Sequence, residues 1–226
     1  MTSPETVEVV HGATPDSSVI LLHGLGADGH DFEPIVPELD LGDAAVRFVF
    51  PHAPVRPVTV NGGVAMRAWY DIASLDRRGP QDEQGIGESS ERLQALIERE
   101  HERGIDYARI VVAGFSQGGA IALHTALRFP RRLAGLMGLS TWLPLADSFM
   151  AEVRARGSVP PAELPVFMAH GNLDQVIPVA FGRHSAQAIE EAGFAVEWHE
   201  YPMGHAVCPA EIADIRAWLL KVLPAL

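Results

Sequence analysis

The chain has 226 residues, of which 47% are apolar, so it can bury a core without disulfides and is not a globally disordered protein. Its 17 basic and 29 acidic residues give a net charge of −12, which repels phosphates and argues against a nucleic-acid partner. This length is typical of one α/β sheet with its helices, so residues 1–226 are predicted to form a single domain.

Short runs of apolar and β-branched residues recur along the chain and predict strands. Several of these runs are apolar on both faces, which is typical of a mostly parallel sheet covered by helices on both sides. In chain order, the predicted strands span residues 7–10, 19–22, 46–50, 110–115, 136–139, 166–169 and 195–201.

Helical patterns lie between the later strands. Residues 90–103 carry an apolar stripe among charges and predict a helix on the outside of the sheet. Residues 117–129 are apolar nearly all round and stop before Pro130, so this helix should be buried. Two further helices are predicted at 179–191 and 209–222. The alternation of strands and helices predicts an α/β fold.

Two segments break this alternation. Residues 51–87 contain several prolines and a Gly-Gly pair, and they are predicted to be mostly irregular. Long loops inside compact domains are usually functional or disordered, and the pair Trp69 and Tyr70 argues against disorder. Residues 141–164 are predicted to form a loop with a short helix around 145–155.

The location of the protein is predicted from what the sequence lacks. Cys208 is the single cysteine, so the chain cannot form an internal disulfide or a cysteine-based zinc site. The first ten residues show neither the basic start nor the apolar stretch of a secretory signal. Apolar runs such as 133–139 are far shorter than the roughly 18 residues that a membrane span needs. We therefore expect a cytoplasmic protein with no membrane span.

A candidate nucleophile stands between a predicted strand and a predicted helix. Ser116 is the centre of the pentapeptide GFSQG at 114–118, which matches GxSxG. The string alone is a weak signal, but its strand–turn–helix context is the one in which a serine hydroxyl is presented above a sheet. The alternative is a tight connection with an incidental serine. The context favours Ser116 as a nucleophile.

A serine nucleophile needs a base and an orienting acid. In this architecture the acid and then the histidine follow the serine in sequence, on loops after later strands. Asp174 follows the strand at 166–169, and His205 follows the strand that ends at Tyr201. Asp147, which follows an earlier strand, is the rival acid.

Two other sites compete with this interpretation. His199, His205 and Cys208 could bind a metal, but no carboxylate or histidine stands at helical ligand spacing, so no metal is predicted. The glycines of 24–29 match the dinucleotide fingerprint GxGxxG, and they would indicate a nicotinamide site.

The dinucleotide alternative is the weaker one. Prolines at 34 and 37 interrupt the helix that the fingerprint requires, and the next strand ends without a carboxylate. The better interpretation is a loop whose Leu25 amide joins the Gln117 amide in binding an oxyanion, with His23 bracing the loop.

Together, the motifs GFSQGG, HGLGADG, HGNLDQVIP and Gly204-His205 closely resemble those of the bacterial carboxylesterase and acyl-protein thioesterase family of α/β-hydrolases. The likeness runs over nearly the whole chain, and it includes residues 56–72, a stretch that precedes the substrate cleft in bacterial carboxylesterases of this family. It implies an α/β-hydrolase fold with a minimal cap.

The resemblance also implies roles for six residues. Ser116 would be the nucleophile, His205 the base and Asp174 its orienter, while the amides of Leu25 and Gln117 would bind the oxyanion. Trp69 would form a wall of the substrate cleft, and the alternative for Trp69 is ordinary core packing.

The predicted function is that of a serine carboxylesterase that forms an acyl-enzyme intermediate on a small-molecule ester or acylated substrate, with no cofactor. An acyl-protein thioesterase or lysophospholipase is the nearer alternative. A nicotinamide-binding oxidoreductase and a non-catalytic binding module with a hydrolase fold are more distant ones. An apolar rim around an uncapped cleft could support a homodimer, although no surface pattern in the sequence demonstrates one.

Overall fold

The structure, a computed structural model, describes residues 4–74, 79–156 and 163–224. A seven-stranded sheet with the order β1-β3-β2-β6-β7-β8-β9 runs through it, accompanied by the hairpin β4-β5. β1 is antiparallel to β3, and the other neighbours in the large sheet are parallel. The strands are β1 Thr6–His11, β2 Ser17–Leu22, β3 Val46–Pro51, β4 Val55–Val58, β5 Val64–Arg67, β6 Ile110–Phe115, β7 Gly135–Leu139, β8 Val166–Gly171 and β9 Val196–Tyr201.

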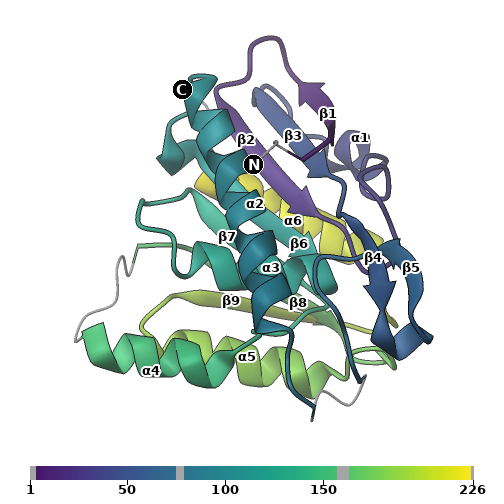
Figure 1. Cartoon of the computed structure of the whole chain (residues 1–226). Coiled ribbons are helices and arrows are strands. Elements are labelled where there is room, and N and C mark those ends of the chain that lie inside the picture. The colour runs from purple at the N-terminus through teal and green to yellow at the C-terminus, as the bar shows by residue number, and fades with distance from the viewer. Residues whose placement is uncertain (1–3, 75–78, 157–162, 225–226) are drawn as a thin grey trace.

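Helices cover both faces of the large sheet, with α2, α3 and α5 on one face and α1 and α6 on the other (Figure 1). α4 lies beside α5. In the described residues, none of the helices is long and apolar enough to cross a bilayer. The helices are α1 Ile35–Leu39, α2 Glu83–Glu102, α3 Gln117–Ala126, α4 Ala146–Arg156, α5 Val179–Glu191 and α6 Pro209–Val222.

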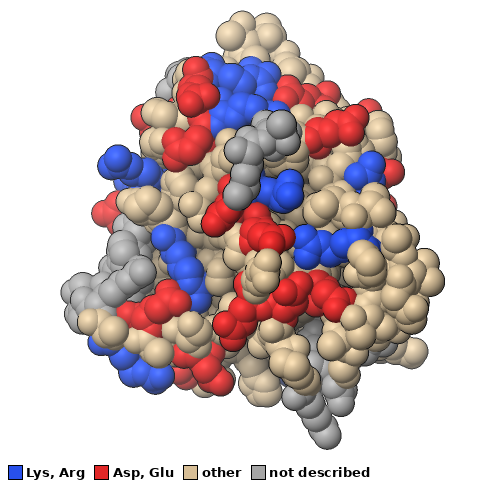
Figure 2. Space-filling view, viewed as in Figure 1, with Lys and Arg blue, Asp and Glu red and all other residues tan. Residues whose placement is uncertain are grey.

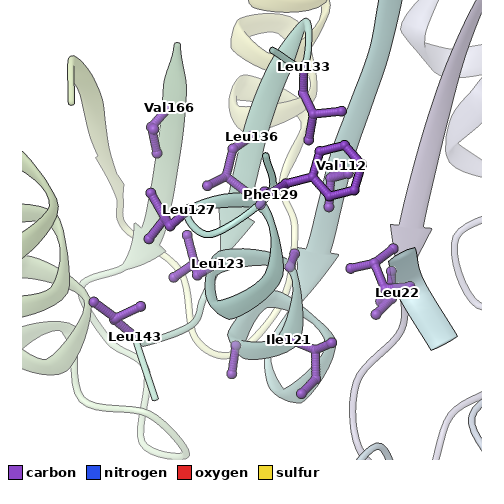
Figure 3. Close-up of a cluster of buried hydrophobic side chains, with 14 of the residues drawn as sticks. Leu22, Val112, Ile121, Leu123, Leu127, Phe129, Leu133, Leu136, Leu143 and Val166 are labelled. Carbon is purple, nitrogen blue, oxygen red and sulfur yellow. The ribbon is translucent and has the colours of Figure 1, made fainter. Parts of the chain in front are cut away.

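The core consists of two apolar clusters, one on each face of the sheet. Helix α3 lies at the centre of the first cluster, where side chains such as Ile121 and Leu123 pack between the sheet and its covering helices (Figure 3). Because α2 covers the outer side of α3, almost every residue of α3 is buried. This explains why its sequence is apolar nearly all round, and it fixes the position of the residue that precedes the helix.

The predicted α/β class and all seven predicted strands are confirmed, with strand ends within two residues of those predicted. The helices at 179–191 and 209–222 are confirmed, and so is the short helix in the 141–164 segment, which is α4. Helix α3 ends at Ala126 rather than Phe129. The amides of Arg128 and Phe129 bond to carbonyls three residues back, at 3.1 and 3.2 Å, so the chain tightens before Pro130.

Helix α2 begins at Glu83 and not at the predicted Ser90. The Asp82 side chain caps it by accepting a hydrogen bond from the amide of Gly85 at 2.9 Å. A Cβ on Gly85 would collide with Asp82 and with Arg56, so this glycine is a site of close packing within the helix. The first turns of α2 were predicted to be a loop because they contain glycine, which is a poor helix former.

Two predictions of irregular structure were wrong in part. Residues 51–87 contain the β4–β5 hairpin and the start of α2. The stretch that was predicted to be broken by prolines contains α1, with Pro34 as its N-cap and Pro37 in its first turn. Proline is tolerated at these positions because the first amides of a helix have no partner within the helix.

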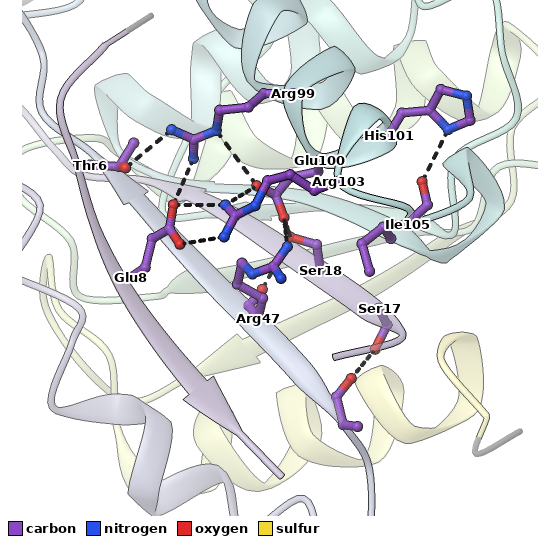
Figure 4. Close-up of polar contacts among 11 residues, drawn as sticks. Thr6, Glu8, Ser17, Ser18, Arg47, Arg99, Glu100, His101, Arg103 and Ile105 are labelled. Carbon is purple, nitrogen blue, oxygen red and sulfur yellow. Dashed lines mark hydrogen bonds and ion pairs between the residues drawn. The ribbon is translucent and has the colours of Figure 1, made fainter. Parts of the chain in front are cut away.

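A buried carboxylate connects α2 to the sheet (Figure 4). Glu100 is fully buried, and it accepts hydrogen bonds from Arg47 at 2.8 Å, from Arg103 at 2.9 Å and from the Ser18 hydroxyl at 3.1 Å. Arg103 also pairs with Glu8 on the edge strand β1 at 2.9 Å. On the face in Figure 2, basic and acidic side chains are interspersed in the same way. The cluster therefore joins three strands to one helix.

We predict that Glu100→Ala lowers the free energy of unfolding by about 3 kcal/mol, because it leaves buried positive charge without its partner. Urea unfolding at constant salt measures this change. Glu91→Ala, on the exposed face of the same helix, is the matched control and should change stability by less than about 0.5 kcal/mol. Equal stability of the two variants would show that the cluster is not a stabilising contact.

Candidate active site

Ser116 occupies a strained turn between β6 and α3. Its φ is 54° and its ψ is −120°, a backbone conformation that residues other than glycine seldom adopt. The turn is held on both sides, since the Ser116 amide donates to the Leu139 carbonyl at 2.9 Å and the Ser116 carbonyl accepts from the Thr141 hydroxyl at 2.6 Å. The surrounding strands thus impose the geometry that presents the hydroxyl.

The glycines on either side of Ser116 are places of close backbone approach. A Cβ on Gly114 would overlap the backbone of Gly118, and a Cβ on Gly118 would overlap the carbonyls of Leu22 and His23. The start of α3 therefore lies directly against the end of β2. This is the collision that the GxSxG spacing predicts.

The structure brings Ser116, His205 and Asp174 together in one hydrogen-bonded chain. His205 Nε2 lies 2.9 Å from Ser116 Oγ, and His205 Nδ1 lies 2.7 Å from Asp174 Oδ2. The side chain of Asp174 is fully buried, whereas that of His205 is 17% exposed. The three residues lie far apart in sequence but on loops at the carboxyl ends of β6, β8 and β9.

Backbone contacts join the two loops that carry Asp174 and His205. The amide of Leu173 donates to the Met203 carbonyl at 3.0 Å. Gly171 permits this approach, because a Cβ there would overlap the carbonyls of Met203 and Gly204. The acid and the histidine are therefore positioned as one unit.

Further contacts fix the carboxylate of Asp174. Its Oδ1 accepts hydrogen bonds from the amides of Val176 and Ile177, each at 2.8 Å. His170 is buried beside it, with Nε2 2.7 Å from the Ile177 carbonyl and 3.4 Å from Asp174 Oδ2. Burial lowers the pKa of His170, so the ring is neutral and braces the acid loop. The sequence alone did not predict these contacts of His170.

Asp147, the rival acid, lies elsewhere. It is exposed in the first turn of α4, which packs beside α5. His199 contacts Glu197 at 3.1 Å and Asp214 at 3.6 Å, while His205 faces Ser116. No group of three or more His, Cys, Asp or Glu side chains that could hold a metal ion occurs among the residues that the structure describes.

The loop after β2 lies directly beside Ser116. A Cβ on Gly24 would stand 3.4 Å from the Cβ of Ser116. Across residues 4–74, 79–156 and 163–224, neither the Leu25 amide nor the Gln117 amide has a hydrogen-bond acceptor. The glycine-rich segment does not open a helix at Gly29, whose amide instead donates to His52 Nδ1 at 3.0 Å. Two backbone donors beside Ser116 in sequence or in space are thus left without an acceptor in the described residues.

His23 holds this loop from within the core. Its Nε2 accepts a hydrogen bond from the Ala53 amide at 3.0 Å, and its Nδ1 lies 2.7 Å from the Gly24 carbonyl. This pattern requires the neutral ring with its proton on Nδ1. Burial lowers the pKa of His23 to about 4, so the ring remains neutral over most of the pH range in which proteins are stable.

Trp69 lies behind the site and does not line a cleft. It is 1% exposed, and its indole N–H donates to the His23 carbonyl at 2.9 Å. Its backbone amide donates to Gln117 Oε1 at 2.9 Å. The structure therefore favours the core-packing alternative for Trp69 over the predicted wall of the substrate cleft.

A cavity of about 190 Å³ lies next to these residues. One wall begins at Tyr70, whose carbonyl accepts a hydrogen bond from Gln117 Nε2 at 2.7 Å. The opposite wall includes Trp142, which follows the Thr141 that contacts Ser116. Its described lining residues are Tyr70, Asp71, Ile72, Ala73, Ser74, Gly79, Pro80, Gln81, Trp142, Leu143 and Phe181.

Comparison with known proteins shows which family the chain belongs to. Residues 4–223 match the model of the phospholipase/carboxylesterase family. An acyl-protein thioesterase 1 from Mycosarcoma maydis is 39% identical over an alignment of 230 positions, gaps included, and the alignment covers 95% of this chain and 94% of that protein. The chain belongs to the phospholipase/carboxylesterase family.

Other members of the phospholipase/carboxylesterase family give the same result. An acyl-protein thioesterase 1 from Cryptococcus neoformans is 37% identical over an alignment of 224 positions, gaps included, and the alignment covers 92% of each chain. The crystal structure of an acyl-protein thioesterase 2 from Zea mays matches with a TM-score of 0.85 and 30% identity, over 97% of this chain and 99% of that chain. The α/β-hydrolase fold and a hydrolase function are thus confirmed. These fungal and plant relatives do not support the bacterial carboxylesterase branch of the family.

The neutral His23 gives a pH prediction. Its pKa is about 4 in the folded protein and 6.5 without burial, so the unfolded chain binds the proton more readily. The contribution of the neutral His23 to the free energy of unfolding is therefore complete above about pH 6.5, and it is lost as the pH falls towards about 4. We predict that His23→Gln, which cannot titrate, loses less stability than the wild type between about pH 7.5 and pH 4.5, by about 2 kcal/mol.

Chemical denaturation at several pH values measures this difference. His184→Gln, at an exposed position on α5, is the control and should follow the wild-type profile. Parallel profiles for His23→Gln and the wild type would contradict the assignment of His23 as a buried neutral acceptor.

Proposed function

We propose that the protein hydrolyses acyl thioesters, and the corresponding oxygen esters, by transferring the acyl group to Ser116 and then to water. The observation that carries this proposal is the chain of hydrogen bonds from Asp174 through His205 to Ser116, at 2.7 and 2.9 Å. This arrangement can make an alcohol nucleophilic at neutral pH.

In the first step His205 Nε2 accepts the hydroxyl proton as Ser116 Oγ attacks the acyl carbonyl carbon. The oxyanion that forms is placed between the amides of Leu25 and Gln117, which have no other acceptor in the described residues. His205 then donates its proton to the sulfur or oxygen of the leaving group, and the carbonyl re-forms as a serine ester. Water repeats these steps and releases the acid.

Asp174 supports this cycle through its position. Its Oδ2 holds the Nδ1 proton of His205, so Nε2 is left free to accept the proton of Ser116. Its other oxygen accepts hydrogen bonds from two backbone amides, which hold the carboxylate in one orientation. The carboxylate also stabilises the imidazolium that forms during the reaction.

The cavity beside Gln117 and Thr141 is proposed to hold the acyl chain. Ile72, Trp142, Leu143 and Phe181 give it apolar walls, which suit a hydrocarbon chain. Proteins named acyl-protein thioesterases resemble this chain over nearly its whole length, and they favour the thioester alternative over the carboxylesterase that the sequence first suggested. The same catalytic chain would act on both bond types.

We predict that Ser116→Ala lowers kcat/KM for a dodecanoyl thioester by at least about 10³-fold, because the nucleophile is removed while the oxyanion donors remain. A thiol-release assay measures the rate, and thermal unfolding checks the fold. A fluorophosphonate should label the wild type at Ser116 and leave the variant unlabelled. Wild-type rates in Ser116→Ala, or a label on another serine, would refute the proposal.

We also predict that Ile72→Trp, which fills the cavity, lowers kcat/KM for dodecanoyl thioester at least about tenfold and leaves the acetyl thioester nearly unchanged. The matched oxygen esters, measured alongside, decide between the two substrate classes. Higher kcat/KM for the oxygen ester of the same chain would restore the carboxylesterase interpretation. Equal losses for both chain lengths would remove the cavity from the acyl site.

A further inference from the structure

Trp69 connects parts of the site that are remote from one another in sequence. Although it is 1% exposed, three of its polar groups have partners. The indole N–H donates to the His23 carbonyl at 2.9 Å, and the backbone N–H donates to Gln117 Oε1 at 2.9 Å. Its carbonyl accepts a hydrogen bond from the hydroxyl of Ser89 on α2. The residue is therefore held from three directions.

The two proposed oxyanion donors come from separate elements. Leu25 follows β2, whereas Gln117 is the first residue of α3. An oxyanion hole works only if both amides point at one place, and displacements of about 1 Å are costly in catalysis. Trp69 contacts the peptide carbonyl two residues before the first donor and the side chain of the second.

The His23 carbonyl is a restricted position. A Cβ on Gly118 would stand only 2.5 Å from it, and the carbonyl accepts the hydrogen bond of the indole N–H. The His23 ring is fixed in turn by the Ala53 amide, and it packs against the indole with ring centroids 5.3 Å apart. Without the indole proton this buried carbonyl would lose a donor and turn to find another, and the Gly24–Leu25 backbone would follow.

We infer that Trp69 is a positioning residue for the oxyanion hole, which sets the amides of Leu25 and Gln117 relative to each other through its two N–H groups. This inference rests on the proposed function, because it assumes that the two amides bind an oxyanion. It assigns Trp69 a role in stabilising the transition state, without contact to the acyl group. The packing of the ring alone would not require a hydrogen bond to His23.

The consequence is specific in kinetic terms. Oxyanion donors act on charge that exists in the transition state and not in the bound substrate. Trp69→Phe retains an aromatic ring and removes the indole N–H. We expect kcat to fall about 10- to 100-fold with KM within about twofold of the wild type. A defect in substrate binding would instead change KM.

The test uses the dodecanoyl thioester as substrate and a dodecyl trifluoromethyl ketone as inhibitor, because the hemiketal that the ketone forms with Ser116 carries a tetrahedral oxyanion. In Trp69→Phe the inhibition constant of the ketone should rise by the same factor by which kcat/KM falls. Trp198→Phe is the matched control, since it removes an indole hydrogen bond to Glu200 of 2.8 Å on β9. Its kinetics should equal those of the wild type.

Gln117→Met provides a second approach to the same contact, and it decides the matter if Trp69→Phe does not fold. It retains the backbone amide of residue 117 and removes the side-chain bonds to Trp69 and Tyr70. Its kcat and ketone affinity should fall together, as for Trp69→Phe. Folded variants with wild-type kcat and wild-type ketone affinity would overturn the inference, as would a loss confined to KM.

The wild type separates this inference from the proposed function. If the wild type neither hydrolyses the thioester and ester nor binds the ketone, the proposed function fails. If the wild type does both and Trp69→Phe equals it, the function stands and the positioning role of Trp69 is wrong.

Discussion

The site depends on one constraint, the turn that holds Ser116 at a positive φ between β6 and α3. A serine in this conformation is unfavourable on its own, by an amount of about 1–3 kcal/mol, and it persists because the surroundings determine it. Neighbouring strands bond the amide and carbonyl of Ser116, and Gly114 and Gly118 allow the backbone of α3 to lie against β2 and β6. The same approach places the loop after β2 beside the hydroxyl. The same packing of α3 against the sheet thus positions both the proposed nucleophile and the proposed oxyanion donors.

The parallel sheet supplies the rest of the arrangement. Because β6, β8 and β9 run in the same direction, their carboxyl ends deliver Ser116, Asp174 and His205 to one edge. The histidine remains partly exposed, whereas the carboxylate is buried and bonded by two amides. This difference suits the proposed mechanism, in which the imidazole exchanges protons with the reactants while its partner stays fixed. The charge cluster around Glu100 fixes one end of α2 to the sheet. Ser89, nearer the other end of α2, donates its hydroxyl hydrogen bond to the Trp69 carbonyl.

Much of this could be predicted from the sequence, for reasons that differ from residue to residue. The strand runs can be predicted because both faces of the sheet are covered. The proximity of Ser116, Asp174 and His205 can be predicted because chain order and strand exits restrict their places. The start of α2 was missed because Gly85 is a poor helix former whose use is tertiary packing. The contact of Trp69 with His23 joins residues that are 46 positions apart, and no local pattern reports it. The contacts of His170 could not be predicted for the same reason, since its partners are a carbonyl and a carboxylate in a folded loop.

The amide side chain of Gln117 also has a consequence for how such a hydrolase can change its substrate range. It bonds both to Trp69 and to the carbonyl of Tyr70, at the point where one wall of the cavity starts. Remodelling near Tyr70 would therefore disturb the proposed catalytic residues through Gln117. Leu143, which also lines the cavity, is held by a different element, because its amide donates a hydrogen bond to the Ser185 hydroxyl of α5 at 2.8 Å. Adaptation to new acyl groups, in nature or in the laboratory, should therefore start from the Leu143 side of the cavity.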